Sequence, residues 1–184
     1  LVKELIEAAA ETIQQTVLSK EMVWSGWYSQ GGDLLSWLTN KASRPDNLYL
    51  SSSMMSQPLI FLTQVSRFVM AWERGLQELF VKQKIVAMTG HSQGIMAALL
   101  VAEEASGRIQ KKRLCEYVQY FLWQGYYMQA SYQEMLASHS SKQALLVNRA
   151  PMVAVSGVSF SRLQGMVDQF NQRVSTVEQL TIAL

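Results

Sequence analysis

The sequence predicts an α/β domain, and three observations support this prediction. Apolar residues recur at helical spacing in several segments, and short apolar runs of strand length stand between them. A Gly-x-Ser-x-Gly motif at residues 90–94 joins one of these runs to the next helical segment. The chain has 184 residues, which is enough for one domain. We therefore expect helices and strands to alternate along the chain.

The first third of the chain is predicted to be helical. Apolar residues at spacings of three and four indicate an amphipathic helix over residues 1–17. No capping residue stands before it, so we expect a further segment to precede residue 1. A Trp/Tyr/Gly-rich connection over 24–32 leads to a short helix that Asp33 caps. Four apolar residues of this short helix are expected to face inward: Leu34, Leu35, Trp37 and Leu38.

The later elements are predicted from the same signals. Residues 44–47 indicate a turn, and Ser56 and Pro58 are suited to cap and begin a helix that runs to about residue 77. In chain order there follow a buried strand over 84–89, helices over 95–105 and 111–132, a polar loop or linker over 133–149, a strand over 151–157, a helix over 161–174 and a strand over 180–184. Residues 151–184 thus form a small β-α-β unit apart from residues 1–150. The chain ends within a predicted strand, so we expect a longer polypeptide.

The charge balance argues against nucleic-acid binding. Lys and Arg number 16 against 14 for Asp and Glu, and the Lys111-Lys112-Arg113 run is too short to create a basic patch. Only 16% of residues are charged, against roughly 25% in ordinary soluble domains. The surface is therefore expected to pack against neighbouring domains or a partner chain.

Other classes of protein are excluded by the cysteine count and by the apolar runs. Cys115 is the single cysteine, so no intrachain disulfide can form, and no Cys/His cluster offers a metal site. The most apolar stretch, over 58–72, contains Gln64, Ser66 and Arg67 and is too short for a membrane span. The chain start does not resemble a secretory signal. A reducing, cytoplasmic compartment fits these features.

The motif Gly90-His91-Ser92-Gln93-Gly94 carries the predicted chemistry. It follows a predicted strand and precedes a predicted helix, as a nucleophile elbow requires. We expect glycine at both ends because a side chain at either end would collide with the neighbouring backbone. Ser92 would then present its hydroxyl at a helix N-terminus, where a developing negative charge is stabilised. The backbone N–H of Gln93 is the predicted oxyanion donor.

A serine nucleophile needs a base, and the two histidines of the chain are poor candidates. His91 is adjacent to Ser92, and neighbouring side chains on a tight turn point in different directions. His139 lies in a polar, Ser-rich stretch where a solvated role is expected. Both histidines therefore stay open as weak candidates for the base.

The motif and its surroundings resemble the acyltransferase domains of fatty acid and polyketide synthases. The shared features are Gly-His-Ser-Gln-Gly with Ser56-Gln57-Pro58-Leu59-Ile60 upstream, together with residues 30–38, the Pro45-Asp46 turn with Tyr49-Leu50, and residues 151–157. The sequence around the serine is most similar to the acetyltransferase domain of the fungal-type fatty acid synthase β subunit and to related starter-unit acyltransferases. The resemblance runs over nearly the whole chain.

This resemblance implies a fold and a reaction. The fold would be an α/β-hydrolase-like core, a parallel sheet with flanking helices, followed by the start of an inserted ferredoxin-like subdomain. Ser92 would attack the thioester of acyl-CoA, and the phosphopantetheine thiol of an acyl carrier protein would accept the acyl group. No permanently bound cofactor is implied, and the implied partners are the carrier protein and other parts of a multienzyme synthase.

The resemblance also implies an acyl preference and two missing groups. Gln124 stands where related malonyl transferases carry an arginine that pairs with the malonyl carboxylate, so an uncharged acyl group such as acetyl is implied. The family's second oxyanion loop would precede residue 1, and Ser29-Gln30-Gly31-Gly32 is a poor substitute because its position matches another part of the domain. Its catalytic histidine would follow residue 184. Three alternatives remain: a serine thioesterase or esterase, a malonyl or other acyl transferase, and a non-catalytic scaffold.

Overall fold

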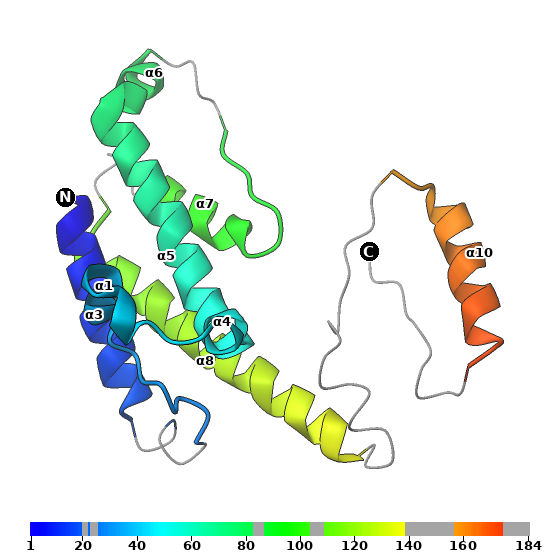
Figure 1. Cartoon of the computed structure of the whole chain (residues 1–184). Coiled ribbons are helices and arrows are strands. Elements are labelled where there is room, and N and C mark those ends of the chain that lie inside the picture. The colour runs from blue at the N-terminus through cyan, green and yellow to red at the C-terminus, as the bar shows by residue number, and fades with distance from the viewer. Residues whose placement is uncertain (20–21, 23–25, 83–86, 104–108, 139–156, 175–184) are drawn as a thin grey trace. The chain divides into compact units, whose positions relative to one another are not determined.

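The computed structural model describes residues 1–19, 22, 26–82, 87–103, 109–138 and 157–174 (Figure 1). The chain divides into two compact units, Leu1–Ser131 and Tyr132–Leu184. All regular elements of the described residues are helical. The predicted strands fall outside the described residues, apart from residues 87–89 and Gly157, which have no regular structure. The α/β fold and the boundary between residues 150 and 151 therefore remain predictions.

The first helix, α1 (Val2–Val17), confirms the prediction from its periodicity. Its apolar stripe is buried, with Leu5, Ala9, Ile13 and Val17 all below 3% exposure. A stripe of this width covers one face of a helix, so α1 needs a partner along its whole length. One of its partners is the long helix α5 (Ser53–Ala71), which contacts α1.

The helix α3 (Leu34–Thr39) is capped as predicted but buries less than expected. The Asp33 carboxylate accepts a hydrogen bond from the backbone N–H of Ser36 at 3.1 Å. Leu34 and Trp37 are buried, whereas Leu35 and Leu38 are 41% and 54% exposed. The prediction that all four face inward was wrong, because one face of a helix this short holds only positions three or four apart.

The chain then passes through a 3-10 turn, η1 (Lys41–Ser43), and the short helix α4 (Asn47–Ser51). The predicted turn over 44–47 is in part correct, since residues 44–46 are irregular and Asn47 begins α4. The carboxylate of Asp46 caps α4 by accepting the backbone N–H of Tyr49 at 2.8 Å.

The start of α5 differs from its prediction. The helix begins at Ser53 with Ser52 as its N-cap residue, so Ser56 is not the cap and Pro58 lies inside the helix. Because Pro58 is only the sixth helical residue, its missing N–H removes one backbone hydrogen bond near the start of the helix and does not break the helix. The buried side chain of Pro58 packs in the core side of α5.

The single helix expected up to about residue 77 is divided. The segment η2 (Trp72–Leu76) is a π-helical bulge, and α6 (Gln77–Val81) follows it. Gly75 has φ +111° in this bulge, a conformation that glycine adopts without a side-chain clash. Such a bulge is a common cause of a helix kink.

The last helices lie close to their predicted positions. They are α7 (Gly94–Glu103), α8 (Lys111–Ser138) and α10 (Phe160–Asn171), the last capped by Ser159. Residues 133–138 are helical, so the predicted loop was wrong there. Glu134, Met135, Leu136 and Ala137 are good helix formers and extend α8. Residues 139–149 of that loop lie outside the described residues.

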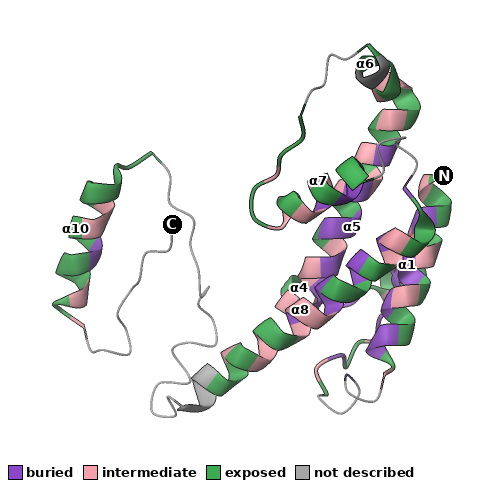
Figure 2. Ribbon diagram, turned by 180° about the vertical axis from the view of Figure 1, so that it is seen from behind, coloured by how far each residue is buried: buried purple, intermediate pink, exposed green. Residues whose placement is uncertain are grey.

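The core of the Leu1–Ser131 unit is built around α5, which contacts α1, α4 and α7. On α5, Phe61 stacks on Tyr117 and packs against Phe121, both from α8, with ring centroids 5.7 and 4.8 Å apart. In Figure 2, both α1 and α5 carry buried positions, coloured purple. This packing brings α7 and α8 onto one central helix.

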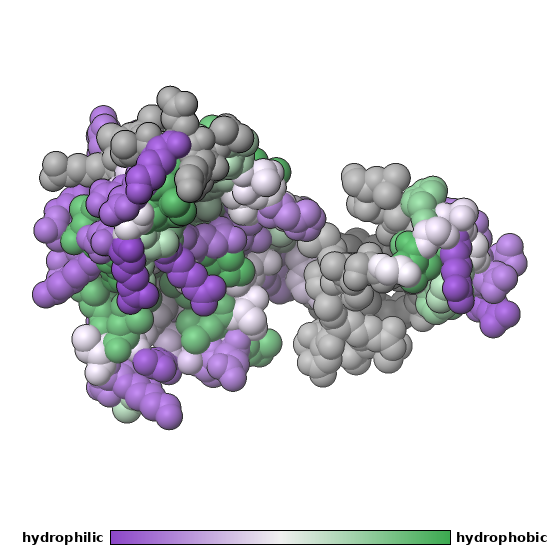
Figure 3. Space-filling model, turned by 90° about the horizontal axis from the view of Figure 1, so that it is seen from above, coloured by the Kyte–Doolittle hydropathy of each residue, from purple (hydrophilic) through white to green (hydrophobic). Residues whose placement is uncertain are grey.

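Apolar side chains also reach the surface, as the space-filling view shows (Figure 3). Ile95 and Leu99, one turn apart on α7, are both exposed. Helix α7 is apolar on nearly every face, and such helices are normally covered all round. This exposure fits the expectation that the surface packs against neighbouring domains or a partner chain.

Candidate active site

The motif at residues 90–94 forms a tight turn directly before α7. The backbone N–H of Gly94 donates to the His91 carbonyl at 2.9 Å, and that of Ile95 donates to the Ser92 carbonyl at 3.1 Å. Ser92 has φ +52°, the one positive φ among the described residues other than glycine. A serine held in this region costs about 1–3 kcal/mol and is typical of functional sites. The turn therefore holds Ser92 in a strained conformation.

The two glycines of the motif have different roles. A Cβ atom at Gly90 would lie 2.1 Å from the carbonyl carbon and oxygen of Gly94 and 2.5 Å from the backbone nitrogen of Ile95. At Gly94 the nearest atom would be Nε2 of Gln64, at an ordinary 3.7 Å. The expectation that both ends need glycine to avoid a backbone collision is thus correct for Gly90 and wrong for Gly94.

Ser92 is exposed, and the backbone N–H of the next residue is not used in a described hydrogen bond. The side chain of Ser92 is exposed, and its hydroxyl has no hydrogen-bond partner among the described residues. The backbone N–H of Gln93 likewise has no acceptor in the described part of the chain. Both groups lie at the N-terminus of α7, where the helix dipole favours negative charge. The arrangement could stabilise an oxyanion formed at Ser92.

The side chain of Gln93 ties the turn to α5. Its amide nitrogen Nε2 donates a hydrogen bond to the backbone carbonyl of Gln57. The amide of Gln64, two turns further along α5, lies beside Gly94. Sequence reasoning missed both α5 glutamines, although their spacing of seven residues in a predicted helix puts them on one face.

Gln57 of α5 also connects the turn to α8. The Nε2 atom of Gln57 lies 3.9 Å from the sulfur of Met128, one helical turn beyond Gln124. Next to Gln124, a Cβ atom at Gly125 would lie 2.5 Å from the Ser53 carbonyl oxygen, so α8 touches the backbone of α5 here. The structure thus brings the turn and the Gln124 region of α8 to the same part of α5.

Two side-chain amide oxygens in this region are unusual. Oε1 of Gln124 and Oε1 of Gln64 are both buried without a hydrogen-bond partner. A buried acceptor without a donor costs about 1–3 kcal/mol, so such groups in native proteins often mark a ligand site or an ordered water. This is an independent reason to place Gln124 at the candidate site.

No general base for Ser92 is found among the described residues. His91 is exposed, and no hydrogen bond joins it to Ser92. His139 lies outside the described residues. The loop at residues 29–32 is engaged elsewhere, since Gln30 donates to the Asp46 carboxylate at 2.8 Å and accepts from its backbone N–H at 3.1 Å.

The tyrosines and the carboxylate near this loop have shifted acidities. The Tyr49 hydroxyl donates to the Gly31 carbonyl at 2.5 Å, and burial raises the pKa of Tyr49 to about 12. Hydrogen bonds from the Tyr49 N–H and the Gln30 side chain lower the pKa of Asp46. Burial, followed by the neighbours Tyr49 and Tyr126, raises the pKa of Tyr28. Both tyrosines therefore stay neutral and Asp46 stays ionised near neutral pH, and the hydrogen bonds of Tyr49 and Asp46 hold the loop against α4.

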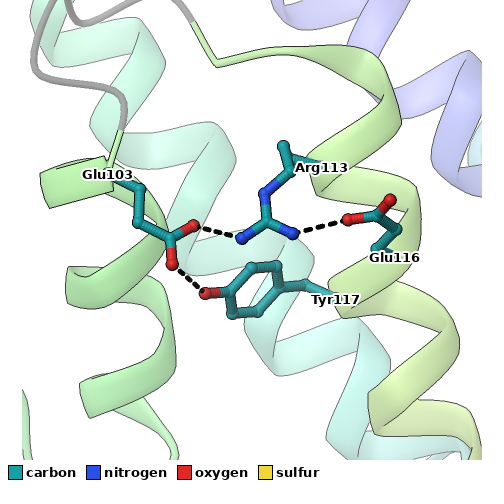
Figure 4. Close-up of polar contacts among 4 residues, drawn as sticks. All are labelled: Glu103, Arg113, Glu116 and Tyr117. Atoms are coloured by element: carbon teal, nitrogen blue, oxygen red, sulfur yellow. Dashed lines mark hydrogen bonds and ion pairs between the residues drawn. The ribbon is translucent and has the colours of Figure 1, made fainter.

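The far end of α7 is joined to α8 by charged groups (Figure 4). The guanidinium of Arg113 lies 2.7 Å from Oε2 of Glu103 and 2.6 Å from Oε2 of Glu116. The Tyr117 hydroxyl donates to the other Glu103 oxygen at 3.2 Å. Hydrogen bonds to Glu103 and Glu116 raise the pKa of Arg113, and burial followed by the Glu103 charge raises that of Tyr117. Both therefore remain protonated donors.

The described residues offer neither a metal site nor a membrane-spanning helix. No group of three or more His, Cys, Asp or Glu side chains in this part of the chain could hold a metal ion. None of its helices is long and apolar enough to cross a bilayer.

Comparisons with known proteins agree on one family. The family model described as "Starter unit:ACP transacylase in aflatoxin biosynthesis" matches residues 1–184. The fatty acid synthase subunit beta of Saccharomyces cerevisiae is 28% identical over 192 residues, which cover 100% of this chain and 9% of the relative. The fatty acid synthase beta subunit aflB of Emericella nidulans is 29% identical over 163 residues, covering 85% of the chain and 7% of the relative.

A shorter match has higher identity. Fatty acid synthase 2 of Mycosarcoma maydis is 36% identical over 106 residues, which cover 55% of this chain and 3% of the relative. The chain therefore spans less than a tenth of the length of these relatives.

Proposed function

Because the chain belongs to the starter unit:ACP transacylase family, we propose that it moves an acyl group from acyl-CoA through Ser92 to the phosphopantetheine thiol of an acyl carrier protein. The relatives named above are subunits of fatty acid synthases, so the proposed setting is a multienzyme synthase. Acyl-CoA and a reduced carrier thiol both fit the cytoplasm.

The chemistry proceeds in two displacements. A base takes the proton of the Ser92 hydroxyl while its oxygen attacks the thioester carbonyl, and the tetrahedral oxyanion collapses with loss of CoA thiolate, which takes up that proton. The carrier thiol then attacks the acyl-serine ester in the same way and returns the proton to Ser92. The base is supplied by a residue outside the described part of the chain.

The conformation of Ser92 is the observation that carries this proposal. A serine with positive φ, exposed at a helix N-terminus beside the unused N–H of Gln93, is what acyl transfer through an oxyanion needs. The close backbone approach at Gly90 maintains this conformation. A serine in an ordinary surface turn would need neither feature.

The proposed acyl group is uncharged, with acetyl as the first candidate. A buried carboxylate such as that of malonyl needs a paired cation. Gln124 supplies an amide in place of a cation, and its buried Oε1 is an acceptor that would oppose a second acceptor. An uncharged acyl chain avoids this conflict.

The test is a covalent adduct on the full-length protein. Wild type and Ser92→Ala are incubated with acetyl-CoA or malonyl-CoA, and the Ser92 peptide is analysed by mass spectrometry. We expect an acetyl adduct of about 42 Da that is absent in Ser92→Ala, and no malonyl adduct.

Other outcomes contradict defined parts of the proposal. A malonyl adduct would overturn the argument from Gln124 but keep Ser92 as the nucleophile. Free CoA without an adduct would indicate a thioesterase, and neither CoA nor adduct would indicate a scaffold. With a carrier protein present, the acetyl group should leave Ser92 and appear on the carrier.

A further inference from the structure

We infer that the side chain of Gln93 is a positioning residue, which holds the oxyanion donor in place by its hydrogen bond to the α5 backbone. This inference rests on the proposed function, because it assigns a role within acyl transfer. The backbone N–H of Gln93 is the proposed donor, whereas the inference concerns the side-chain amide of the same residue. The two groups are separate and can be tested separately.

The turn at residues 90–94 makes few described hydrogen bonds to other elements. Among the described residues, its backbone hydrogen bonds are local, joining Gly94 to His91, Ile95 to Ser92 and Met96 to Gln93. The side chains of His91 and Ser92 are exposed and have no partner in the described part of the chain. Gln93 is the motif residue whose side chain makes a described hydrogen bond to another element. The turn therefore depends on Gln93 for a directed contact with the core.

The acceptor of this hydrogen bond, the backbone carbonyl of Gln57, is held rigidly. The Gln57 carbonyl belongs to α5, and the next residue, Pro58, is buried. Pro58 fixes its own φ, and α5 packs on α1, α4 and α7. A hydrogen bond to this carbonyl thus fixes the position of Gln93 relative to α5, the helix around which the core of the unit is built.

The strained conformation of Ser92 requires such a contact. Ser92 stores strain at φ +52°, so the turn would relax if nothing opposed it. A displacement of about 1 Å in a catalytic group can reduce the rate about 100-fold. A side chain that fixes the peptide between Ser92 and Gln93 therefore affects the rate of the chemical step more than substrate binding.

The experiment uses isosteric substitutions in the full-length protein. Gln93→Met keeps the length of the side chain but cannot donate a hydrogen bond. Gln93→Glu keeps the shape but presents a carboxylate to the Gln57 carbonyl. The control is Gln119→Met, the same substitution at an exposed position of α8. For each variant the rate of Ser92 acylation is measured against acetyl-CoA concentration, together with Tm.

The expected order of limiting acylation rates is wild type, then Gln93→Met, then Gln93→Glu. Gln93→Met should lower the limiting rate by about 10-fold to 100-fold while the half-saturating acetyl-CoA concentration changes by less than about 2-fold. Gln119→Met should match wild type. Peptide-level hydrogen exchange over residues 87–100 should be faster in both Gln93 variants than in the control.

The outcomes separate this inference from the proposed function. If wild type acylates and Gln93→Met acylates at the same limiting rate, the inference is wrong and the proposed function stands. If the half-saturating concentration rises while the limiting rate is unchanged, Gln93 contacts substrate and is not a positioning residue. If wild type forms no acyl-serine at all, the proposed function fails first.

Discussion

The two ends of α7 are held by different physical means. At its N-terminus, a strained serine, a backbone contact that only glycine permits and one amide hydrogen bond define the turn at residues 90–94. At its C-terminus, Glu103 meets Arg113 and Tyr117 of α8 through ionic and hydrogen-bonded contacts. The first end is specified by steric fit, which leaves no room for a side chain at Gly90. The second is specified by charge and is open to solvent, so its contribution is smaller and depends on salt.

The largest effect is expected for Gly90→Ala. Its Cβ atom would lie 2.1 Å from backbone atoms of Gly94, so the turn must open. We expect a loss of about 3 kcal/mol in the free energy of unfolding and no measurable acylation of Ser92. Chemical denaturation and the adduct assay measure the two effects.

The matched control is Gly94→Ala, where the nearest atom is 3.7 Å away. Alanine is a better helix former than glycine, so this variant should stay within about 1 kcal/mol of wild type and still be acylated. Equal effects of the two substitutions would contradict the difference between the two glycines.

A smaller effect separates strain from chemistry at Ser92. Ser92→Gly and Ser92→Ala should both abolish acylation, because neither has a nucleophile. Glycine accepts φ +52° whereas alanine does not, so Ser92→Gly should be more stable than Ser92→Ala by about 1 kcal/mol. Tm values of the two variants give this difference directly. Equal Tm values would mean that the turn relaxes and stores no strain.

How much of this site the sequence could predict depends on whether the signal is local. The helix α1, the Asp33 cap and the position of Ser92 before a helix all follow from residues within a few positions of each other. The hydrogen bond between Gln93 and Gln57 joins residues 36 positions apart, and no local pattern predicts it. The choice of that partner depends on how α5 packs beside α7.

The errors have the same origin. Leu35 and Leu38 follow an apolar pattern, but the direction of the core around α3 decides which of its leucines are buried. Pro58 looks like a helix start, yet the upstream residues 53–57 are also helical and the proline is accommodated inside the first turns. The different needs of Gly90 and Gly94 depend on distances of a few ångströms that the motif does not encode.

The smallest effect is expected at the charged end of α7. Glu103→Gln keeps the shape of the side chain and can still accept from Tyr117, but it removes one of the two carboxylates beside Arg113. Because the ion pair is partly exposed, Tm should fall by only about 1 °C in low salt, and the difference should vanish near 1 M salt, where the Debye length is about 3 Å. Acylation of Ser92 should be unchanged, since the turn is held independently at the other end. A fall in the acylation rate would instead show that the two ends of α7 are coupled through the helix.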